Sequence, residues 1–198
     1  MNYHKAAFKA AYGTARQLPA STCPEVSFAG RSNVGKSSLL NKLMKRKGLA
    51  KVSSTPGKTA TINFYDMDGV DFVDLPGYGY AKFAKSELHR WSDLIEGYFN
   101  QERYFALVCS LIDIRHDPTA LDINMVEFLK DSGLPYMIVL TKADKLSKQQ
   151  IIKQTAAIRK KLKLPKDVPF VATSSESGLG VDELRQIIAQ YAEDVPEI

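Results

Sequence analysis

The chain has few cysteines and no long apolar run, and each scarcity excludes a class of protein. Its two cysteines, Cys23 and Cys109, lie far apart and lack the close spacing of metal ligands. This argues against a disulfide-stabilised secreted scaffold, and we interpret both as reduced thiols of a cytoplasmic protein. No apolar run approaches the roughly 20 residues that a membrane-spanning helix needs, so we expect no membrane partner.

Acidic residues are absent from two long segments. Residues 26–65 contain eight Lys or Arg and no acid, and residues 151–166 contain six and again no acid. Between them, residues 66–127 hold twelve acids against five bases. A run of residues of one charge most often marks only a solvent-exposed surface of the protein. This segregation, in a chain of net charge +5, nevertheless favours a polyanionic partner larger than one nucleotide, above all RNA.

The length of 198 residues predicts a single folded domain. We expect an N-terminal extension over residues 1–22, one nucleotide-binding domain over 23–194 and a short tail over 195–198, in a monomer. Residues 1–18 show no secretory signal. They are rich in alanine and carry bases without acids, as organellar transit peptides do, but they lack serine and arginine enrichment. We therefore interpret them as an ordinary extension leading into the first strand.

A phosphate-binding loop is the most informative motif. The pattern G-x-x-x-x-G-K-[ST] follows an apolar run at residues 26–29 and precedes apolar spacing typical of a helix. Its residues are Gly30, Arg31, Ser32, Asn33, Val34, Gly35, Lys36 and Ser37. Glycines let successive N–H groups and a helix N-terminus face one anion, Lys36 would reach the β- and γ-phosphates, and the Ser37 hydroxyl would hold Mg²⁺. The motif in this context predicts a nucleotide site.

Strands and helices alternate along the rest of the chain. We expect strands over residues 26–29, 61–65, 70–73, 105–112, 136–140 and 168–172. We expect helices over residues 38–44, 86–100, 121–130, 148–162 and 181–191. The alternation predicts an α/β three-layer fold. Its sheet would be six-stranded and mostly parallel, with one antiparallel edge hairpin turning at Asp68-Gly69 and helices on both faces. Ligand loops would then share one rim.

The motif Thr141-Lys142-Ala143-Asp144, directly after an apolar strand, predicts guanine specificity. A carboxylate at Asp144 can accept hydrogen bonds from guanine N1–H and from its exocyclic amine. Adenine offers neither donor there and would leave the carboxylate unpaired, at a cost of about 1–3 kcal/mol or more. Lys142 would lay its methylene stem over the base. By itself T-K-x-D is common on surface loops, but its place after a strand and a phosphate-binding loop favours the guanine interpretation.

Two other loops complete the predicted site. Asp74-Leu75-Pro76-Gly77 ends a strand, and its aspartate would hold the Mg²⁺ shell through water while the Gly77 N–H meets the γ-phosphate. Thr173-Ser174-Ser175 ends the last strand and would contact the guanine through hydroxyls and backbone N–H groups. In chain order, the four loops resemble the G1, G3, G4 and G5 motifs of translation-factor-type GTPases.

The sequence resembles the EngB (YihA/YsxC) GTPases of the TrmE–Era group over nearly all of its length. The segments that carry the resemblance are Gly30-Arg31-Ser32-Asn33-Val34-Gly35-Lys36-Ser37-Ser38, Leu49-Ala50, Pro56-Gly57-Lys58-Thr59, Asn63-Phe64, Asp74-Leu75-Pro76-Gly77-Tyr78-Gly79-Tyr80-Ala81, Asp113-Ile114-Arg115-His116 and Thr141-Lys142-Ala143-Asp144-Lys145. The long tyrosine-rich G3 motif is the most specific of them. Ala60 departs from the family, which usually has glutamine there, and the N-terminal extension is only loosely similar.

The resemblance implies a cytoplasmic switch that binds GTP and GDP with Mg²⁺ and acts in maturation of the large ribosomal subunit, and so in growth and division. The remaining motif, G2, would supply a threonine that ligates Mg²⁺ only with GTP bound. Thr59 is the choice, with Thr61 and Thr55 as alternatives. Catalytic roles would fall to Lys36, Thr59 and Gly77. The implied nucleotide contacts are residues 30–38, Gly57, Lys58, Thr59, Ala60, Thr61, Asp74, Leu75, Pro76, Gly77, Thr141, Lys142, Ala143, Asp144, Thr173, Ser174 and Ser175.

Hydrolysis is expected to be slow without help. Tyr78 stands where efficient GTPases carry a glutamine that orients the attacking water, and a phenol with a pKa near 10 is a poor base. Asn33 occupies the position that, in potassium-activated relatives of the TrmE type, helps to hold K⁺ beside the phosphates. The alternative is that asparagine stands there only because it tolerates the backbone angles. The ribosomal partner would be a second source of acceleration.

Other residues and other functions fit the sequence less well. Arg115-His116 are interpreted as structural or partner-facing and Trp91 as a core residue, while stacking on RNA bases is an alternative role for Tyr80 and Phe83. A metabolic P-loop kinase is disfavoured, because no segment of clustered arginines appears and T-K-x-D has no role there. A GTP-sensing scaffold that binds a protein partner and hardly turns over stays open as the alternative.

Overall fold

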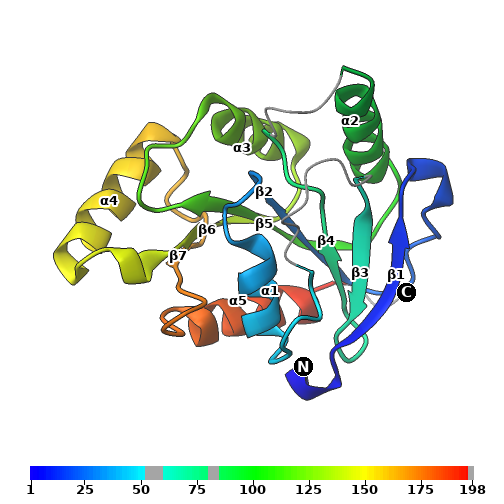
Figure 1. The fold of residues 1–198 in the computed structure, drawn as a ribbon, viewed down its shortest axis with the longest axis horizontal. Helices are drawn as coiled ribbons and strands as arrows, with labels where there is room; N and C mark the ends of the chain where they lie inside the picture. The colour runs from blue at the N-terminus through cyan, green and yellow to red at the C-terminus, as the bar shows by residue number, and fades with distance from the viewer. Residues whose placement is uncertain (52–59, 80–84, 196–198) are drawn as a thin grey trace.

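The computed structural model describes residues 1–51, 60–79 and 85–195 (Figure 1). Its strands are β1 (Ala7–Tyr12), β2 (Glu25–Gly30), β3 (Ile62–Asp66), β4 (Asp71–Asp74), β5 (Phe105–Asp113), β6 (Tyr136–Thr141) and β7 (Phe170–Ala172). Its α-helices are α1 (Lys36–Leu43), α2 (Lys85–Phe99), α3 (Ala120–Ser132), α4 (Lys148–Lys161) and α5 (Val181–Glu193). The expected elements are confirmed, with bounds that differ by a few residues.

The strands form one sheet in the order β1-β3-β4-β2-β5-β6-β7. The five strands from β4 to β7 in this order are parallel, whereas β3 pairs antiparallel with both β4 and β1. Asp68 and Gly69, with φ of 60° and 88°, form the turn between β3 and β4. Positive φ at both central residues suits the twist of a tight hairpin, as their Asp-Gly sequence predicts.

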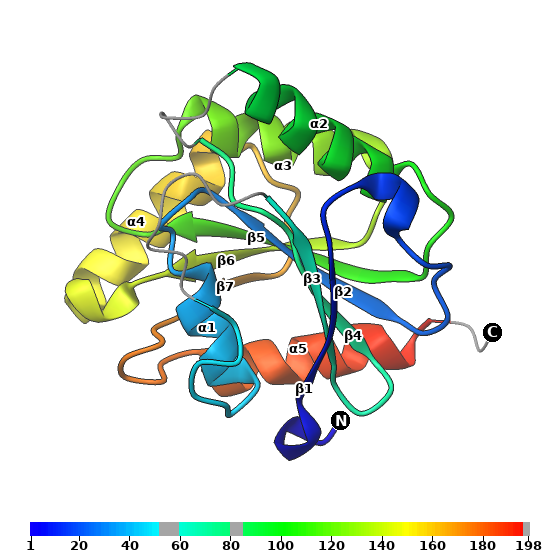
Figure 2. The same ribbon diagram turned by 45° about the vertical axis from the view of Figure 1, so that its right-hand side comes forward.

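Helices cover both faces of the sheet, as Figure 2 shows. The apolar sides of α1 and α5 pack on one face, where Leu40 and Leu184 join Phe28 and Leu107 in a buried cluster. On the other face, α2 packs over β3 and β4, while α3 and α4 pack over β5 and β6. This gives the predicted three layers. The strands β2 and β5 lie between β4 and β6 in the sheet and are buried on both faces. This explains their continuous apolar runs.

The sheet has seven strands rather than the expected six, because residues 7–12 of the predicted extension form β1. It pairs with β3 and takes the edge position that we expected for the hairpin. Its pairing shifts register between Phe8 and Ala10, and most of its residues remain exposed. A short, mostly exposed edge strand carries little hydrophobic periodicity, so the sequence pattern did not predict it.

The parallel register places the carboxyl ends of the strands on one edge of the sheet. Phe28 of β2 lies opposite Asp74, Gly30 lies opposite Leu111, and Asp113 of β5 lies opposite Thr141. Leu140 in turn lies opposite Ala172 at the end of β7. The predicted common rim of the four loops is therefore confirmed.

Candidate functional site

The phosphate-binding loop joins the end of β2 at Gly30 to the first residue of α1, Lys36. It turns through Asn33 and Gly35, with φ of 65° and 99°, and Gly35 caps the helix N-terminus in the left-handed region. A side chain would be strained at that φ, which accounts for glycine there. The loop thus presents the start of α1, with its positive dipole end, toward the rim.

The loop after β6 contacts the phosphate-binding loop through hydrogen bonds to its backbone carbonyls. Thr141 Oγ1 donates to the Val34 carbonyl at 2.6 Å, and Lys142 Nζ donates to the Asn33 carbonyl at 2.8 Å. Lys142 Nζ also lies 3.1 Å from Asp113 Oδ2. The predicted guanine-binding motif and phosphate-binding loop are therefore joined by direct contacts, although 105 residues separate Lys36 from Thr141 along the chain.

Asp113 contacts the lysine of this motif. The sequence analysis names it only within a segment that carries the family resemblance, and not as a site residue. Its carboxylate accepts hydrogen bonds from the Arg115 backbone N–H and from Arg115 Nε, in addition to its ion pair with Lys142. Burial alone would raise the pKa of Asp113, but these hydrogen bonds lower it to about 2. Of the two roles predicted for Arg115, structural and partner-facing, these contacts favour the structural one, because Arg115 helps to hold Asp113.

Asp144 and Ser174 bring the loops after β6 and β7 together. Ser174 Oγ donates to Asp144 Oδ1 at 2.7 Å, and the Ser177 N–H donates to Ser174 Oγ at 3.0 Å. The hydrogen bond from Ser174 lowers the pKa of Asp144, opposed by partial burial. Asp144 is thus an ionised acceptor at the rim, as guanine recognition requires.

Several predicted contact residues form the frame of this region. Thr173 is fully buried, and both its N–H and its Oγ1 donate to the Leu140 carbonyl. The Ala143 N–H donates to the Thr173 carbonyl at 3.0 Å. Ser175 and Lys142 are partly exposed beside them. The side chain of Thr173 therefore positions the loop in this structure, whereas Asp144, Lys142 and Ser175 face its accessible side.

Lys36 and Asp74 form a direct ion pair, and both side chains are largely buried. Lys36 begins α1 and Asp74 ends β4, so the pair joins the phosphate-binding loop to the G3 loop. Ser37 Oγ, next in the chain, donates to the Lys51 carbonyl at 3.2 Å. A hydroxyl and a carboxylate are hard oxygen ligands of the kind that Mg²⁺ prefers, so these residues fit the expected ion.

The residues after Asp74 fold back onto the phosphate-binding loop. The Tyr78 N–H donates to the Gly30 carbonyl at 3.2 Å, and the Ser32 N–H donates to the Tyr78 carbonyl at 2.8 Å. A Cβ added at Gly77 would lie 3.1 Å from Ser32 N and 3.2 Å from Ser32 Cα. The absence of a side chain at Gly77 therefore permits a close approach of the two backbones.

The side chain of Tyr78 points into the protein. Its hydroxyl donates to Asp122 Oδ1 of α3 at 2.8 Å, and the residue is only 5% exposed. Burial and the Asp122 carboxylate raise the pKa of Tyr78 far above its usual range. In this conformation the phenol can neither orient water at the rim nor accept a proton from it. Asp122 is a second site residue that sequence reasoning missed.

Most of the expected G2 residues lie outside the described residues. Gly57, Lys58 and Thr59, with the alternative Thr55, fall in the segment 52–59, and Tyr80, Ala81 and Phe83 fall in 80–84. Of the expected G2 residues the structure describes Ala60 and Thr61, and Thr61 Oγ1 donates to Asn63 Oδ1 at 3.2 Å. Trp91 is partly buried and its Nε1 donates to the Pro76 carbonyl, so it contacts the G3 loop as well as the core.

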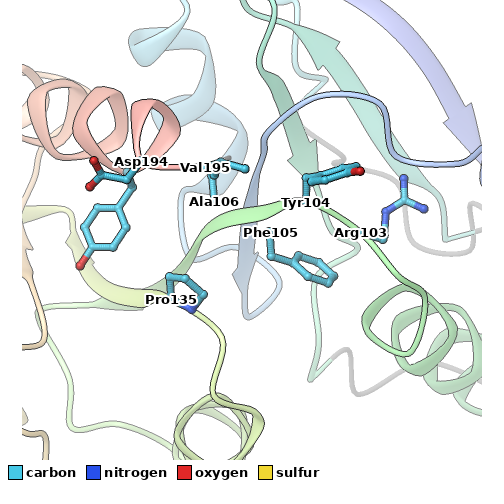
Figure 3. Close-up of a pocket in the computed structure, with 8 residues that line it drawn as sticks. Arg103, Tyr104, Phe105, Ala106, Pro135, Asp194 and Val195 are labelled. Carbon is cyan, nitrogen blue, oxygen red and sulfur yellow. The ribbon is translucent and has the colours of Figure 1, made fainter. Parts of the chain in front are cut away.

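A pocket of about 450 Å³ lies away from this rim, where β5 and β6 begin and α5 ends (Figure 3). Arg103, Phe105, Ala106 and Pro135 line it together with the end of α5. None of the predicted phosphate or guanine contacts lies there, so we do not assign it to nucleotide. Among the described residues, no helix combines the length and the apolar character that a membrane crossing requires.

Comparison with known proteins adds to this geometry. Residues 25–142 match the family model described as 50S ribosome-binding GTPase, and residues 93–194 match that of the elongation factor Tu GTP-binding domain. "Probable GTP-binding protein EngB" of Syntrophomonas wolfei subsp. wolfei is 49% identical over 187 residues, which cover 94% of this chain and 96% of that protein. The protein of the same name from Exiguobacterium sibiricum is 46% identical over 192 residues, covering 96% of this chain and all of its own length.

Solved structures agree at the level of the fold. A crystal structure of a probable GTP-binding protein EngB has a TM-score of 0.69 and 22% identity, over 86% of this chain and 99% of its own. Era in complex with MgGDPNP and a segment of 16S ribosomal RNA has a TM-score of 0.66 and 24% identity, over 90% of this chain and 58% of its own. With the family model and the near full-length relatives, this shows that the chain belongs to the EngB family of GTP-binding proteins, within the P-loop GTPases.

Proposed function

We propose that this protein is a Mg²⁺-dependent GTPase with slow intrinsic hydrolysis that acts as a nucleotide-gated switch in assembly of the large ribosomal subunit. The observation that carries the proposal is that the four loops predicted to bind nucleotide lie on one rim, in a chain that matches a 50S ribosome-binding GTPase model. The protein would act in the cytoplasm as a monomer.

The proposed roles follow the chemistry of the rim residues. Lys36 would neutralise charge on the β- and γ-phosphates, and the N–H groups of residues 33–38 would face the phosphates. Ser37 and Thr59 would ligate Mg²⁺ directly and Asp74 through water. When bound, Mg²⁺ would offset the charge that develops on the phosphate oxygens. Asp144 would accept the guanine donors, with Ser174 holding its carboxylate in place.

Slow turnover is supported by the position of Tyr78. The residue that follows the G3 glycine is committed to Asp122 and only 5% exposed, so it supplies no group to the attacking water in this conformation. Acceleration would come from K⁺ at Asn33 or from the ribosomal partner. Asn33 has a φ of 65°, so the backbone alone would already favour asparagine there, and hydrolysis rates in KCl and NaCl separate the two interpretations.

Binding to ribosomal RNA is supported by the exposed bases of the acid-free segments. Lys153, Lys160, Lys163 and Lys166 are exposed on α4 and the loop after it, and Lys45, Arg46 and Lys47 are exposed after α1. Phosphate contacts by such side chains release counterions, so the affinity for an RNA-containing particle would fall steeply with salt.

The test is binding of the purified protein to large ribosomal subunits across a salt series. The proposal predicts a steep loss of affinity with salt, and a weaker slope for Lys153→Gln/Lys160→Gln. The control, Gln149→Ala/Gln154→Ala, changes the same helix without changing its charge and should bind as the unaltered protein does. GTP binding without any salt-sensitive affinity for the subunit would contradict the ribosomal role. It would favour the alternative, a GTP-sensing scaffold with a protein partner and little turnover.

A further inference from the structure

The G3 loop is closed on the phosphate-binding loop. Two backbone hydrogen bonds hold Tyr78 against Gly30 and Ser32, and the backbone of Gly77 approaches Ser32 so closely that a Cβ would be 3.1 Å from its nitrogen. The ion pair between Lys36 and Asp74 closes the same two segments on each other. In this arrangement, Gly77 and Ser32 leave little room between them for a further ligand group.

A side-chain contact outside the nucleotide loops holds this closure. The Tyr78 hydroxyl donates to Asp122 Oδ1, and the same carboxylate accepts through Oδ2 from the N–H and the hydroxyl of Thr119, at 2.8 Å each. Asp122 is 3% exposed. Because Thr119 caps α3 and Asp122 completes its capping box, the acceptor is fixed to the start of a helix. Tyr78 is thus tied to a rigid element.

Two neighbours surround this pair. The Trp91 ring meets the Tyr78 ring edge to face with centroids 6.4 Å apart, and its indole N–H donates to the Pro76 carbonyl at 3.2 Å. On the other side, a Cβ at Gly79 would lie 3.0 Å from Leu121 of α3. Residues 76–79 therefore contact both α2 and α3. To move Gly77 away from Ser32, this segment must leave at least part of these contacts.

We propose that the Tyr78–Asp122 pair sets the preference of the site between GDP and GTP. This inference rests on the proposed role of the Gly77 N–H at the γ-phosphate. GDP needs the guanine contacts and the phosphate-binding loop, and neither set of contacts requires Gly77 to leave Ser32. GTP brings a third phosphate to that position, so its binding must draw Gly77 from Ser32 and work against the hydrogen bond to Asp122. The pair therefore weakens GTP binding selectively.

The test removes only the donor of this hydrogen bond. Tyr78→Phe keeps the ring against Trp91 and should strengthen binding of guanosine 5′-(β,γ-imido)triphosphate by about tenfold, the value of one hydrogen bond to a charged acceptor. Affinity for GDP should change by less than about twofold. The matched control is Tyr136→Phe, whose buried hydroxyl has no hydrogen-bond partner among the described residues and lies at the opposite end of β6 from Thr141.

Trp91 gives an independent readout, because it is the only tryptophan of the chain and contacts residues 76–79 through the Pro76 carbonyl. Its emission should shift to the red when the triphosphate analogue binds and stay near that of the free protein with GDP. The free Tyr78→Phe protein should already be shifted part of the way. Asp122→Asn, which keeps the side-chain shape but loses charge, should shift emission in the same direction if thermal melting shows it to be folded.

The outcomes separate this inference from the proposed function. Equal ratios of GDP to triphosphate affinity in the unaltered protein and Tyr78→Phe would overturn the inference while leaving GTP binding intact. A change of the same size in Tyr136→Phe would also overturn it, because the effect would not belong to the pair. Failure of the unaltered protein to bind either nucleotide would overturn both the inference and the proposed function.

Discussion

The Ser174 hydroxyl donates a hydrogen bond to Asp144 Oδ1 at 2.7 Å and so joins the loops that follow β7 and β6. This bond holds an ionised acceptor where the proposed guanine contacts lie. Asp144→Asn would replace one acceptor oxygen by a donor that faces the donors of guanine. We expect it to weaken binding of GTP and GDP alike by roughly 10- to 100-fold, measured by fluorescence titration.

Two variants show whether that loss belongs to the site. Asp131→Asn changes an exposed aspartate at the end of α3 and should leave both affinities unchanged. Ser174→Ala keeps the Asp144 carboxylate but frees it to rotate, so it should weaken both nucleotides to a smaller extent than Asp144→Asn. Full GTP affinity in Asp144→Asn would refute the guanine role of this residue.

The ion pair between Lys36 and Asp74 should stabilise the nucleotide-free protein. Both side chains are about 10% exposed or less, so Lys36→Met would leave a buried carboxylate unpaired. We expect a loss of about 3 kcal/mol or more in the free energy of unfolding, measured with urea. The double variant Lys36→Met/Asp74→Asn should recover part of it, because the uncompensated charge is gone.

The exposed pair of Lys5 with Asp68 supplies the comparison for this measurement. Lys5→Met should change stability little, because surface ion pairs are solvated and contribute little. If Lys36→Met were no more destabilising than Lys5→Met, the Lys36–Asp74 contact would be of no importance to the free protein.

Potassium dependence can be separated from backbone geometry at Asn33. Its φ of 65° suits glycine as well as asparagine, so Asn33→Gly should keep the loop conformation and remove the side-chain oxygen. If Asn33 helps to hold K⁺, the unaltered protein hydrolyses GTP faster in KCl than in NaCl at equal ionic strength, and Asn33→Gly loses that difference. The same rate in both salts for the unaltered protein would eliminate the potassium role.

Asp113 should make the stability of the protein depend on pH in the acid range. Hydrogen bonds from Arg115 and Lys142 outweigh its burial and lower its pKa from the usual 3.8 of an aspartate to about 2. Because the pKa of Asp113 is lower in the folded than in the unfolded chain, its ionised form stabilises the protein at pH values above the unfolded pKa. This contribution is lost as the pH falls from about 4 through about 2. Asp113→Asn should therefore flatten the fall in unfolding free energy between about pH 4 and about pH 2. An unchanged slope, equal to that of the exposed control Asp93→Asn, would contradict the assignment.

The rim could be predicted from the sequence because it depends on local signals in a fixed order. Each nucleotide loop follows an apolar strand, and parallel strands place their carboxyl ends together. That reasoning located Lys36, Asp74 and Asp144 on one edge, and the register of the strands confirms it. The hairpin turn at Asp68-Gly69 was equally predictable, because its residues favour positive φ.

What the sequence did not predict depends on contacts between distant segments. Strand β1 forms by pairing with β3, 50 to 59 positions away, and carries almost no burial pattern of its own. The bond between Tyr78 and Asp122 spans 44 positions. From the sequence, Tyr78 was notable as part of the tyrosine-rich G3 motif and for standing where efficient GTPases carry glutamine, and Asp122 only as one acid of an acidic region. Their pairing becomes visible once α3 is placed beside the G3 loop.

The central claim is that the nucleotide state controls binding to the large ribosomal subunit, and co-sedimentation tests it most directly. Purified protein is centrifuged with large subunits in the presence of a non-hydrolysable GTP analogue or of GDP, at one salt concentration. The account predicts that the protein sediments with the subunits in the analogue and stays in the supernatant with GDP. Absence from the subunits in both states, or equal binding in both, would contradict it.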